Sequence, residues 1–294
     1  MSFEEVLEDH RAGSLAITCG AAEHFRELLS GSFDAQEQFL REDLARVVAA
    51  HPGMAAVLNL VNGLLLAFEA DGAKSALKFL ETFLAALNRS VQRIGTTMAT
   101  LIPPGCTIAT YSRSDTVLSV LREALKLSKT PRIMCAEGRP NFEGQEFAKE
   151  MLALGLRVEL FTDVGLISRL KSASFVLVGA DALTADGLLN KVGTTALLKT
   201  AEGLGILRYA VLGTEKVLPP SLRDELRPKA HPAAEVWSEP VAGLTVRNPI
   251  FEWVPLPLLS GIVTEDGAVS PQELLGRVQS VRRSDEFPSV QKRG

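Results

Sequence analysis

The spacing of apolar residues divides the chain into two regions with different periods. From residue 2 to about residue 100, apolar residues recur three or four positions apart, which predicts amphipathic helices and no strand. Pro52-Gly53 and Asp71-Gly72 interrupt this pattern and separate successive helices. We therefore expect an amino-terminal helical domain over residues 1–102.

The period changes after Pro103-Pro104-Gly105, because two successive prolines cannot continue a helix. Short apolar runs then alternate with helical segments. The expected strands are residues 107–110, 132–135, 157–161, 174–178, 208–212 and 260–264, and the expected helices include residues 115–127, 144–154 and 191–204. This alternation predicts a Rossmann-like α/β domain over residues 103–276, with a mainly parallel sheet covered by helices on both faces. Ligands of such domains bind beyond the carboxyl ends of the strands.

Two further segments lack a regular period. A polar, proline-rich stretch runs from residue 217 to Trp237, and its composition predicts a loop or lid. Beyond residue 276, positive and negative side chains are mixed, which predicts a flexible, solvated tail over residues 277–294.

Composition narrows the class of protein. The chain has 294 residues, of which 46% are hydrophobic and 22% charged, and this balance predicts a globular protein. A net charge of −4 gives no global electrostatic reason to bind nucleic acid or an anionic membrane. The longest apolar stretch, residues 57–68, is interrupted by Asn59 and Asn62, so we expect a buried helix and no membrane span.

The cysteines and the amino terminus indicate a cytoplasmic location. Cys19, Cys106 and Cys135 are far apart and lack paired spacing, so we expect neither a disulfide framework nor a metal site. The first thirteen residues are acidic and lack the apolar core of a signal peptide.

Candidate chemistry is concentrated in residues 179–194, GADALTADGLLNKVGT. Asp181 follows the expected strand 174–178 at its carboxyl end. Asn190 and Lys191 precede the expected helix, and a lysine beside free amides at a helix start suits a phosphate. This segment therefore predicts an anion site with a carboxylate beside it.

Other strands bring further polar side chains to the same edge of the sheet. Ser112, Arg113 and Ser114 immediately precede the expected helix that begins at Asp115, so an arginine and free amides converge there. Glu137, Arg139 and Asp163 follow the next two strands. With Lys191, these residues form a candidate phosphate cradle.

Purely structural roles are the alternatives. Ser114 would then cap its helix, Arg139 would pair with Glu137 or Asp163, and Lys191 would be a solvated residue of the first helical turn.

Two common enzyme classes do not fit the chain. Three of the four histidines lie in the helical region and His231 lies in the proline-rich stretch, so no Ser-His-Asp arrangement is predicted at the sheet edge. A GxGxxG fingerprint is absent after the first strand, which argues against an NAD-dependent dehydrogenase.

Several motifs, in this order, resemble the translation initiation factor 2B α/β/δ family over roughly residues 100–275. That family shares its fold with methylthioribose-1-phosphate isomerase and ribose-1,5-bisphosphate isomerase. The similar segments are YSRSDTVLSVL from Tyr111, EGRP from Glu137, Thr162-Asp163, GADALTADGLLNKVGT from Gly179, NPIFE from Asn248 and TEDG from Thr264.

The resemblance implies roles for individual residues. The family isomerases use the aspartate of GAD, which Asp181 matches, and a cysteine after the first strand, where this chain has Ser112. A serine hydroxyl needs an adjacent base to become reactive, and the sequence indicates none. The family's phosphate-binding arginine and Asn-Lys pair match Arg139, Asn190 and Lys191.

The resemblance also extends, less closely, to the amino terminus and to assembly. Arg11-Ala12-Gly13-Ser14 is similar to a phosphate-binding segment of the isomerases, although its small residues are in a different order. We further expect a homodimer or higher homo-oligomer formed through the α/β domain, with an apolar patch at Trp253, Pro255, Leu256, Leu258 and Leu259.

Because Ser112 replaces the cysteine, we expect first a regulatory or non-catalytic protein that binds a phosphorylated sugar or a nucleoside monophosphate. The alternative is an aldose–ketose isomerase, an intramolecular oxidoreductase, with Asp181 and Ser112 as the catalytic pair. A scaffold with a vestigial site is the third hypothesis. None of them calls for a cofactor.

Overall fold

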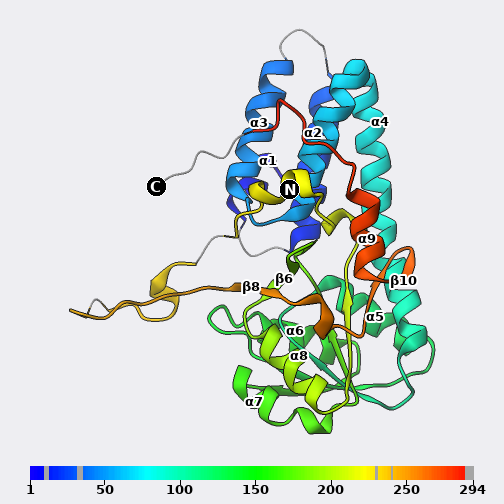
Figure 1. Cartoon of the computed structure of the whole chain (residues 1–294), viewed down its shortest axis with the longest axis vertical. Helices are drawn as coiled ribbons and strands as arrows, with labels where there is room; N and C mark the ends of the chain where they lie inside the picture. The colour runs from blue at the N-terminus through cyan, green and yellow to red at the C-terminus, as the bar shows by residue number, and fades with distance from the viewer. Residues whose placement is uncertain (10–12, 32–35, 229–230, 240, 289–294) are drawn as a thin grey trace.

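The computed structural model describes residues 1–9, 13–31, 36–228, 231–239 and 241–288 (Figure 1). Its amino-terminal region consists of α1 (Phe3–Glu8), α2 (Ser14–Leu29), α3 (Gln36–Ala50) and α4 (Ala55–Leu101). This confirms the helical character predicted from the apolar spacing. A capping box begins α1, since Ser2 and Glu5 exchange side chain to backbone hydrogen bonds.

Helix α4 belongs to both halves of the molecule. It is kinked at Asp71-Gly72, where Gly72 has a φ of +59° that favours glycine. Its first half lies in the core of the helical region, whereas Ile94 and Met98 pack against α5 (Asp115–Lys126) of the α/β region. By length and composition α4 could cross a membrane, but it is the central core helix of this fold.

The α/β region is built on a seven-stranded sheet with the order β10-β9-β7-β4-β1-β2-β3. All strands are parallel except β10, which returns antiparallel to β9. The strands are β1 (Thr107–Thr110), β2 (Arg132–Ala136), β3 (Arg157–Phe161), β4 (Phe175–Val178), β7 (Leu207–Val211), β9 (Gly261–Thr264) and β10 (Gly267–Val269). These findings confirm the mainly parallel α/β fold.

Helices cover both faces of this sheet. They are α5, α6 (Glu143–Ala153), α7 (Asp163–Ser168), α8 (Thr194–Gly203) and α9 (Pro271–Val278), with 3₁₀ turns η2 (Leu170–Ser172), η3 (Thr214–Lys216), η4 (Pro220–Glu225), η5 (Ala233–Glu235) and η6 (Leu256–Leu258). One apolar core lies on each face of the sheet. Val117, Leu121 and Phe147 belong to one core, and Leu166, Leu197 and Leu198 belong to the other.

A second, three-stranded antiparallel sheet joins the two regions, and the sequence did not predict it. It consists of β5 (Ala182–Thr184), β6 (Gly187–Lys191) and β8 (Phe251–Val254). Leu189 faces the core of the helical region, whereas its neighbour Leu188 faces a core of the α/β region. Figure 1 shows β6 and β8 between the two halves of the molecule.

This small sheet corrects one predicted boundary. The helix expected from residue 191 begins only at Thr194, because residues 187–191 pair as β6 with both β5 and β8.

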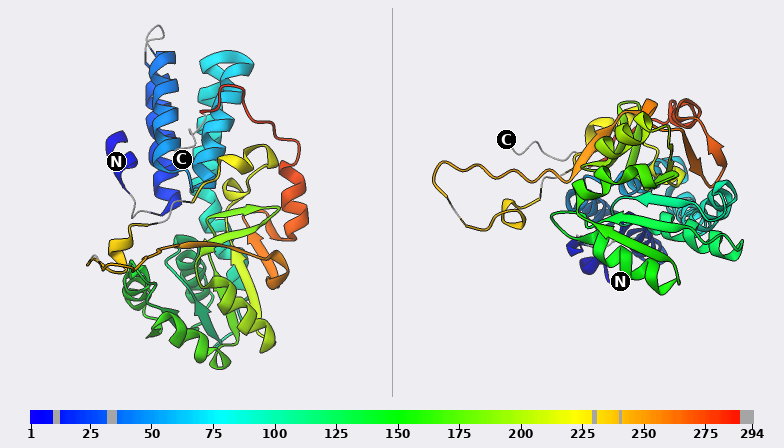
Figure 2. Two further views of the ribbon diagram at one scale, coloured as in Figure 1. Left: turned by 60° about the vertical axis from the view of Figure 1, so that its left-hand side comes forward. Right: turned by 90° about the horizontal axis from the view of Figure 1, so that it is seen from below.

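The carboxyl-terminal segment differs from the expected solvated tail. After α9 it returns to the helical region and runs along α4 (Figure 2). Ser284 is fully buried and its amide donates to Asn62 Oδ1 at 2.9 Å, while Phe287 is only 3% exposed in the helical core. The expected tail is therefore wrong for residues 279–288, because an apolar anchor and backbone hydrogen bonds fix this segment.

The proline-rich stretch is also only partly a loop. Its first part forms η4, which inserts Leu222 and Leu226 into the helical core. The part around η5 extends away from the rest of the molecule (Figure 2) and exposes Trp237 and Leu244.

The apolar patch expected around Trp253 is largely internal. Leu258 is buried, Leu256 and Leu259 pack against a sheet core, and Trp253 packs on the helical core beneath Arg223. The purely structural alternative, a core edge, describes these residues.

Candidate functional site

Two strands, β1 and β4, bring the predicted catalytic residues to one edge of the large sheet. Strand β1 lies between β4 and β2, and the chain departs from β1 toward β2 and later crosses to β4 on the other side. The carboxyl ends of β1 and β4 therefore flank a topological switch point, where α/β sheets bind their ligands. Ser112 follows β1 and Asp181 follows β4.

Asp181 carries a carboxylate with no hydrogen-bond or ion-pair partner among the described residues. Burial raises the pKa of this carboxyl, and the charge of Glu143 acts in the same direction. The charges of Lys216 and Lys191 act in the opposite direction. A carboxyl with this balance favours its protonated form more than an exposed aspartate does, and it is suited to donate a proton.

Lys216 approaches Asp181 from the neighbouring strand. It ends the 3₁₀ turn η3 that follows β7, and its Nζ donates to the carbonyl oxygen of Ala180 at 2.8 Å. The sequence interpretation missed Lys216, although its position a few residues beyond a predicted strand was a usable signal.

Ser112 is held in an unusual backbone conformation. Its φ is +63°, which few residues other than glycine adopt. Its Oγ donates to Oε1 of Glu143 at 2.9 Å. The expectation that no base adjoins this hydroxyl is therefore wrong, because Glu143 begins α6 next to the carboxyl end of β1.

Glu143 links Ser112 to Lys191. The Nζ of Lys191 lies 2.7 Å from the same Oε1, and the lysine side chain is only 6% exposed. The second oxygen, Oε2, is buried and has no hydrogen-bond partner within the described part of the chain. Gly138 makes room for this carboxylate, since a Cβ at that position would lie 2.8 Å from Glu143 Cδ. The sequence interpretation missed Glu143 entirely.

Two expected anion ligands, Asp163 and Asn190, make hydrogen bonds within the fold. The carboxylate of Asp163 accepts hydrogen bonds from the amides of Gly138 and Arg139, both at 2.9 Å, and so holds the EGRP turn. Asn190 is buried and its Nδ2 donates to Thr194 Oγ1 at 3.2 Å.

The start of α8 already contains a carboxylate. Glu252 Oε1 accepts hydrogen bonds from the amides of Gly193 at 2.9 Å and Thr195 at 2.8 Å. The amides of Gly193 and Thr195, where the sequence predicts a phosphate site, therefore already have a carboxylate acceptor, because β8 pairs with β6 in a register that places Glu252 there.

The start of α5 has no side-chain carboxylate bonded to its first amides among the described residues. Ser114 caps this helix, with its Oγ accepting from the Val117 amide at 3.3 Å. The amides of Asp115 and Thr116, in the first turn, are left without an intrahelical acceptor. Arg113 lies beside them, although Glu150 and Asp115 both pair with its guanidinium.

The remaining expected ligands are Arg139, Glu137 and Arg11. The Arg139 side chain is exposed, lies 5.0 Å from the ring centroid of Phe142, and has no carboxylate partner among the described residues. Glu137 is partly buried directly after β2. Arg11 lies outside the described residues. Ser14, three positions later at the start of α2, has a buried Oγ for which the described residues provide no hydrogen-bond partner.

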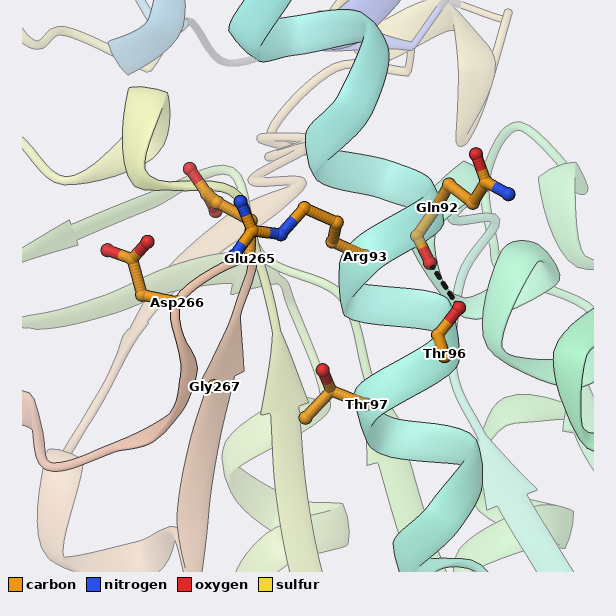
Figure 3. A pocket seen from close by; sticks show the side chains of 7 residues that line it. All are labelled: Gln92, Arg93, Thr96, Thr97, Glu265, Asp266 and Gly267. Carbon is orange, nitrogen blue, oxygen red and sulfur yellow. Dashed lines mark hydrogen bonds between the residues drawn. The ribbon is translucent and has the colours of Figure 1, made fainter.

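Two cavities lie near this edge without including Asp181. One, of about 440 Å³, is lined by Arg93 and Thr97 of α4 and by Glu265 and Asp266 of the β9–β10 turn (Figure 3). The other, of about 530 Å³, adjoins Arg113 between α4 and α5. Across the part of the chain that the structure describes, no three His, Cys, Asp or Glu side chains are grouped to hold a metal ion.

Comparison with known proteins identifies the family. The model of the initiation factor 2 subunit family matches residues 11–271. The chain belongs to this family. A ribose 1,5-bisphosphate isomerase of Methanocaldococcus jannaschii is 28% identical over 280 residues, which cover 92% of this chain and 91% of the relative.

Other members of the initiation factor 2 subunit family are similar at a comparable level. A putative translation initiation factor eIF-2B subunit 2-like protein of Pyrococcus horikoshii is 32% identical, over 79% of this chain and 80% of the relative. The crystal structure of the Pyrococcus horikoshii translation initiation factor eIF-2B superposes with a TM-score of 0.81 and 26% identity, and covers 93% of this chain and 97% of that one. The family therefore contains proteins named as isomerases and proteins named as translation factors.

Proposed function

We propose that this protein binds a phosphorylated sugar at the Ser112–Asp181 edge and interconverts its aldose and ketose forms. The observation that carries the proposal is the unpaired Asp181 carboxyl, which faces a second carboxylate, that of Glu143, and two lysines. A carboxyl whose protonated form is favoured by burial, together with a nearby carboxylate that pairs with a lysine, is the combination that proton-transfer chemistry needs.

The surrounding groups suit the phosphates of such a substrate. The start of α5 offers backbone amides, and Arg139 is a cation without a carboxylate partner among the described residues. The buried Ser14 Oγ at the uncapped start of α2 is a further donor for a phosphate oxygen. The name of the Methanocaldococcus jannaschii relative, a ribose 1,5-bisphosphate isomerase, supports this ligand class.

The experiment measures binding and turnover separately. Ribose 1,5-bisphosphate and methylthioribose 1-phosphate are titrated into the protein by calorimetry, and ketose formation is followed by nuclear magnetic resonance. We expect wild-type turnover, and we expect Asp181→Asn to lose it while retaining binding. Turnover that is unchanged in Asp181→Asn would remove Asp181 from the mechanism.

A regulatory, non-catalytic protein is the second candidate, and Ser112 favours it. The family isomerases that the sequence resembles have a cysteine at this position, and a hydroxyl is a much weaker acid than a thiol. Binding of either sugar phosphate or of a nucleoside monophosphate, without any turnover, is the outcome that would decide for this candidate.

We also propose that the protein forms a homodimer or a higher homo-oligomer and is cytoplasmic. The fold of this chain is similar to that of a chain in the crystal structure of a tetrameric eIF2B-beta2-delta2 complex. Among the described residues, Trp237, Val241 and Leu244 extend from the molecule with exposed apolar side chains, which would be covered in an assembly. The free thiols of all three cysteines fit a reducing compartment.

A further inference from the structure

The two carboxylate oxygens of Glu143 differ in their hydrogen bonding among the described residues. Oε1 accepts both the Ser112 hydroxyl at 2.9 Å and the Lys191 ammonium at 2.7 Å, whereas Oε2 is buried without a partner. An unpaired carboxylate oxygen in a protein interior is costly, so a site that keeps one commonly uses it. Oε2 therefore needs an explanation beyond the stability of the fold.

Ser112 is poorly suited to act as the base itself. A hydroxyl group must first lose its own proton before it can accept another one. The hydrogen bond runs from Ser112 to Glu143, so the serine is the donor of this pair and the carboxylate is the acceptor. Lys191 pairs with that carboxylate at 2.7 Å and so helps to fix its position.

We propose that Glu143 is the catalytic base of the isomerisation and that Ser112 and Lys191 position its carboxylate. The inference rests on the isomerase activity proposed above. For ribose 1,5-bisphosphate, the sugar phosphate for which the Methanocaldococcus jannaschii relative is named, the proton to be removed is the one on C2.

The proton transfers balance with the groups present. Asp181 gives its proton to the ring oxygen, and the bond from C1 to that oxygen breaks with its electron pair on the oxygen. Glu143 takes the proton from C2, and the electron pair of that bond forms the C1–C2 double bond of an enol. The Glu143 carboxyl then delivers a proton to C1, which in D₂O is a deuteron whenever the carboxyl has exchanged with solvent, while the C2 hydroxyl proton passes to Asp181 as the ketone forms. Both carboxyl groups end in their starting states.

The backbone around the carboxylate is arranged to fix it. Phe142, which precedes Glu143, has a φ of +57°, and Ser112 opposite it has a φ of +63°. Two non-glycine residues in this region of conformational space are uncommon, and such strain is concentrated at functional sites. Gly138 leaves the carboxylate the space it occupies.

The test compares Glu143→Gln and Glu143→Asp with a control on the same helix, Glu146→Gln, whose exposed carboxylate pairs with Lys149. Turnover of ribose 1,5-bisphosphate is measured in D₂O, together with deuterium at C1 of the product and the calorimetric Kd. We expect Glu143→Gln to lower kcat on the order of 10²- to 10⁴-fold and to leave Kd within about threefold. Glu146→Gln should match the wild type.

Ser112→Ala separates positioning from catalysis. We expect kcat to fall by about tenfold, the effect of one hydrogen bond, while deuterium still enters C1. Glu143→Asp shortens the side chain and should recover part of the activity that Glu143→Gln loses, which also guards against a folding defect in the amide variant.

The outcomes distinguish a failure of the Glu143 assignment from a failure of the proposed isomerase function. If the wild type turns over and Glu143→Gln keeps the wild-type kcat, Glu143 is not the base and the isomerase function stands. If the wild type binds ribose 1,5-bisphosphate and produces no ketose, isomerisation is overturned and the role of Glu143 with it.

Discussion

The Nζ of Lys216 lies 2.8 Å from the carbonyl oxygen of Ala180, so the lysine charge is fixed beside Asp181. Among the groups that act on the Asp181 carboxyl, Lys216 is the strongest that lowers its pKa. We expect Lys216→Met to raise this pKa further and to shift the corresponding limb of the pH–rate profile to higher pH. Lys149→Met, which removes an exposed lysine from α6, is the control and should leave the profile unchanged.

Asp181→Asn should stabilise the fold at neutral pH. The folded-state pKa of Asp181 is raised above its ordinary value of 3.8, so the folded protein binds its proton more tightly than the unfolded chain does. The free energy of unfolding therefore falls as the pH rises from 3.8 through the folded-state pKa. Urea denaturation should show a gain in Asp181→Asn at pH 7 that disappears below pH 3.8. An equal gain at both pH values would assign the effect to packing.

Glu252→Gln should destabilise the start of α8. The carboxylate accepts two amide hydrogen bonds there, and its charge complements the positive end of the helix. We expect a loss of about 1 kcal/mol in the free energy of unfolding, measured with urea. Glu159→Gln, an exposed carboxylate on β3, is the matched control and should have no measurable effect.

Phe287→Ala tests the attachment of the carboxyl-terminal segment. Phe287 is buried in the helical core, and truncation of a buried phenylalanine costs about 3 kcal/mol or more. Val281→Ala, in the same segment but 37% exposed, should cost much less. Equal effects of the two substitutions on urea denaturation would mean that Phe287 does not anchor the segment.

The exposed apolar side chains around η5 make a prediction about assembly. We expect light scattering to report a dimer or larger species at micromolar concentration, and the double substitution Trp237→Ser, Leu244→Ser to weaken it. Val164→Ser removes a 75% exposed apolar side chain from α7 and is the control. A wild-type monomer at this concentration contradicts the prediction.

The parallel sheet could be predicted because its inner strands are buried on both faces and are therefore continuous apolar runs, as in residues 175–178. Because β6 is also buried on both faces, the sequence pattern did not identify it as a strand. Leu188 and Leu189 are buried in different cores, so the strand shows no alternation, and it is short enough to be taken for the start of α8. Strand β8 lies far along the chain, and only its pairing with β6 places Glu252 at that helix.

Site residues were predictable where a strand alone positions them. Asp181 and Ser112 follow β4 and β1 directly, so the rule for parallel sheets places both. Glu143 reaches Ser112 only because the EGRP turn reverses at Gly138 and Phe142, both at positive φ. The roles of Asp163 and Glu252 depend likewise on which amides the loops present to them, and the residue types alone carry no such information.

The small sheet makes the two lobes of the molecule, its helical region and its α/β region, inseparable. Each of its faces is sealed by a different lobe, through Leu189 on one side and Leu188 on the other, and α4 crosses the junction as well. An excised α/β lobe would present Ala182, Leu189 and Trp253 to water directly beside Asp181 and Lys191. Calorimetric melting of the intact chain should consequently give a single cooperative transition, and a ligand held at the Asp181 edge should raise the melting temperature of both lobes together.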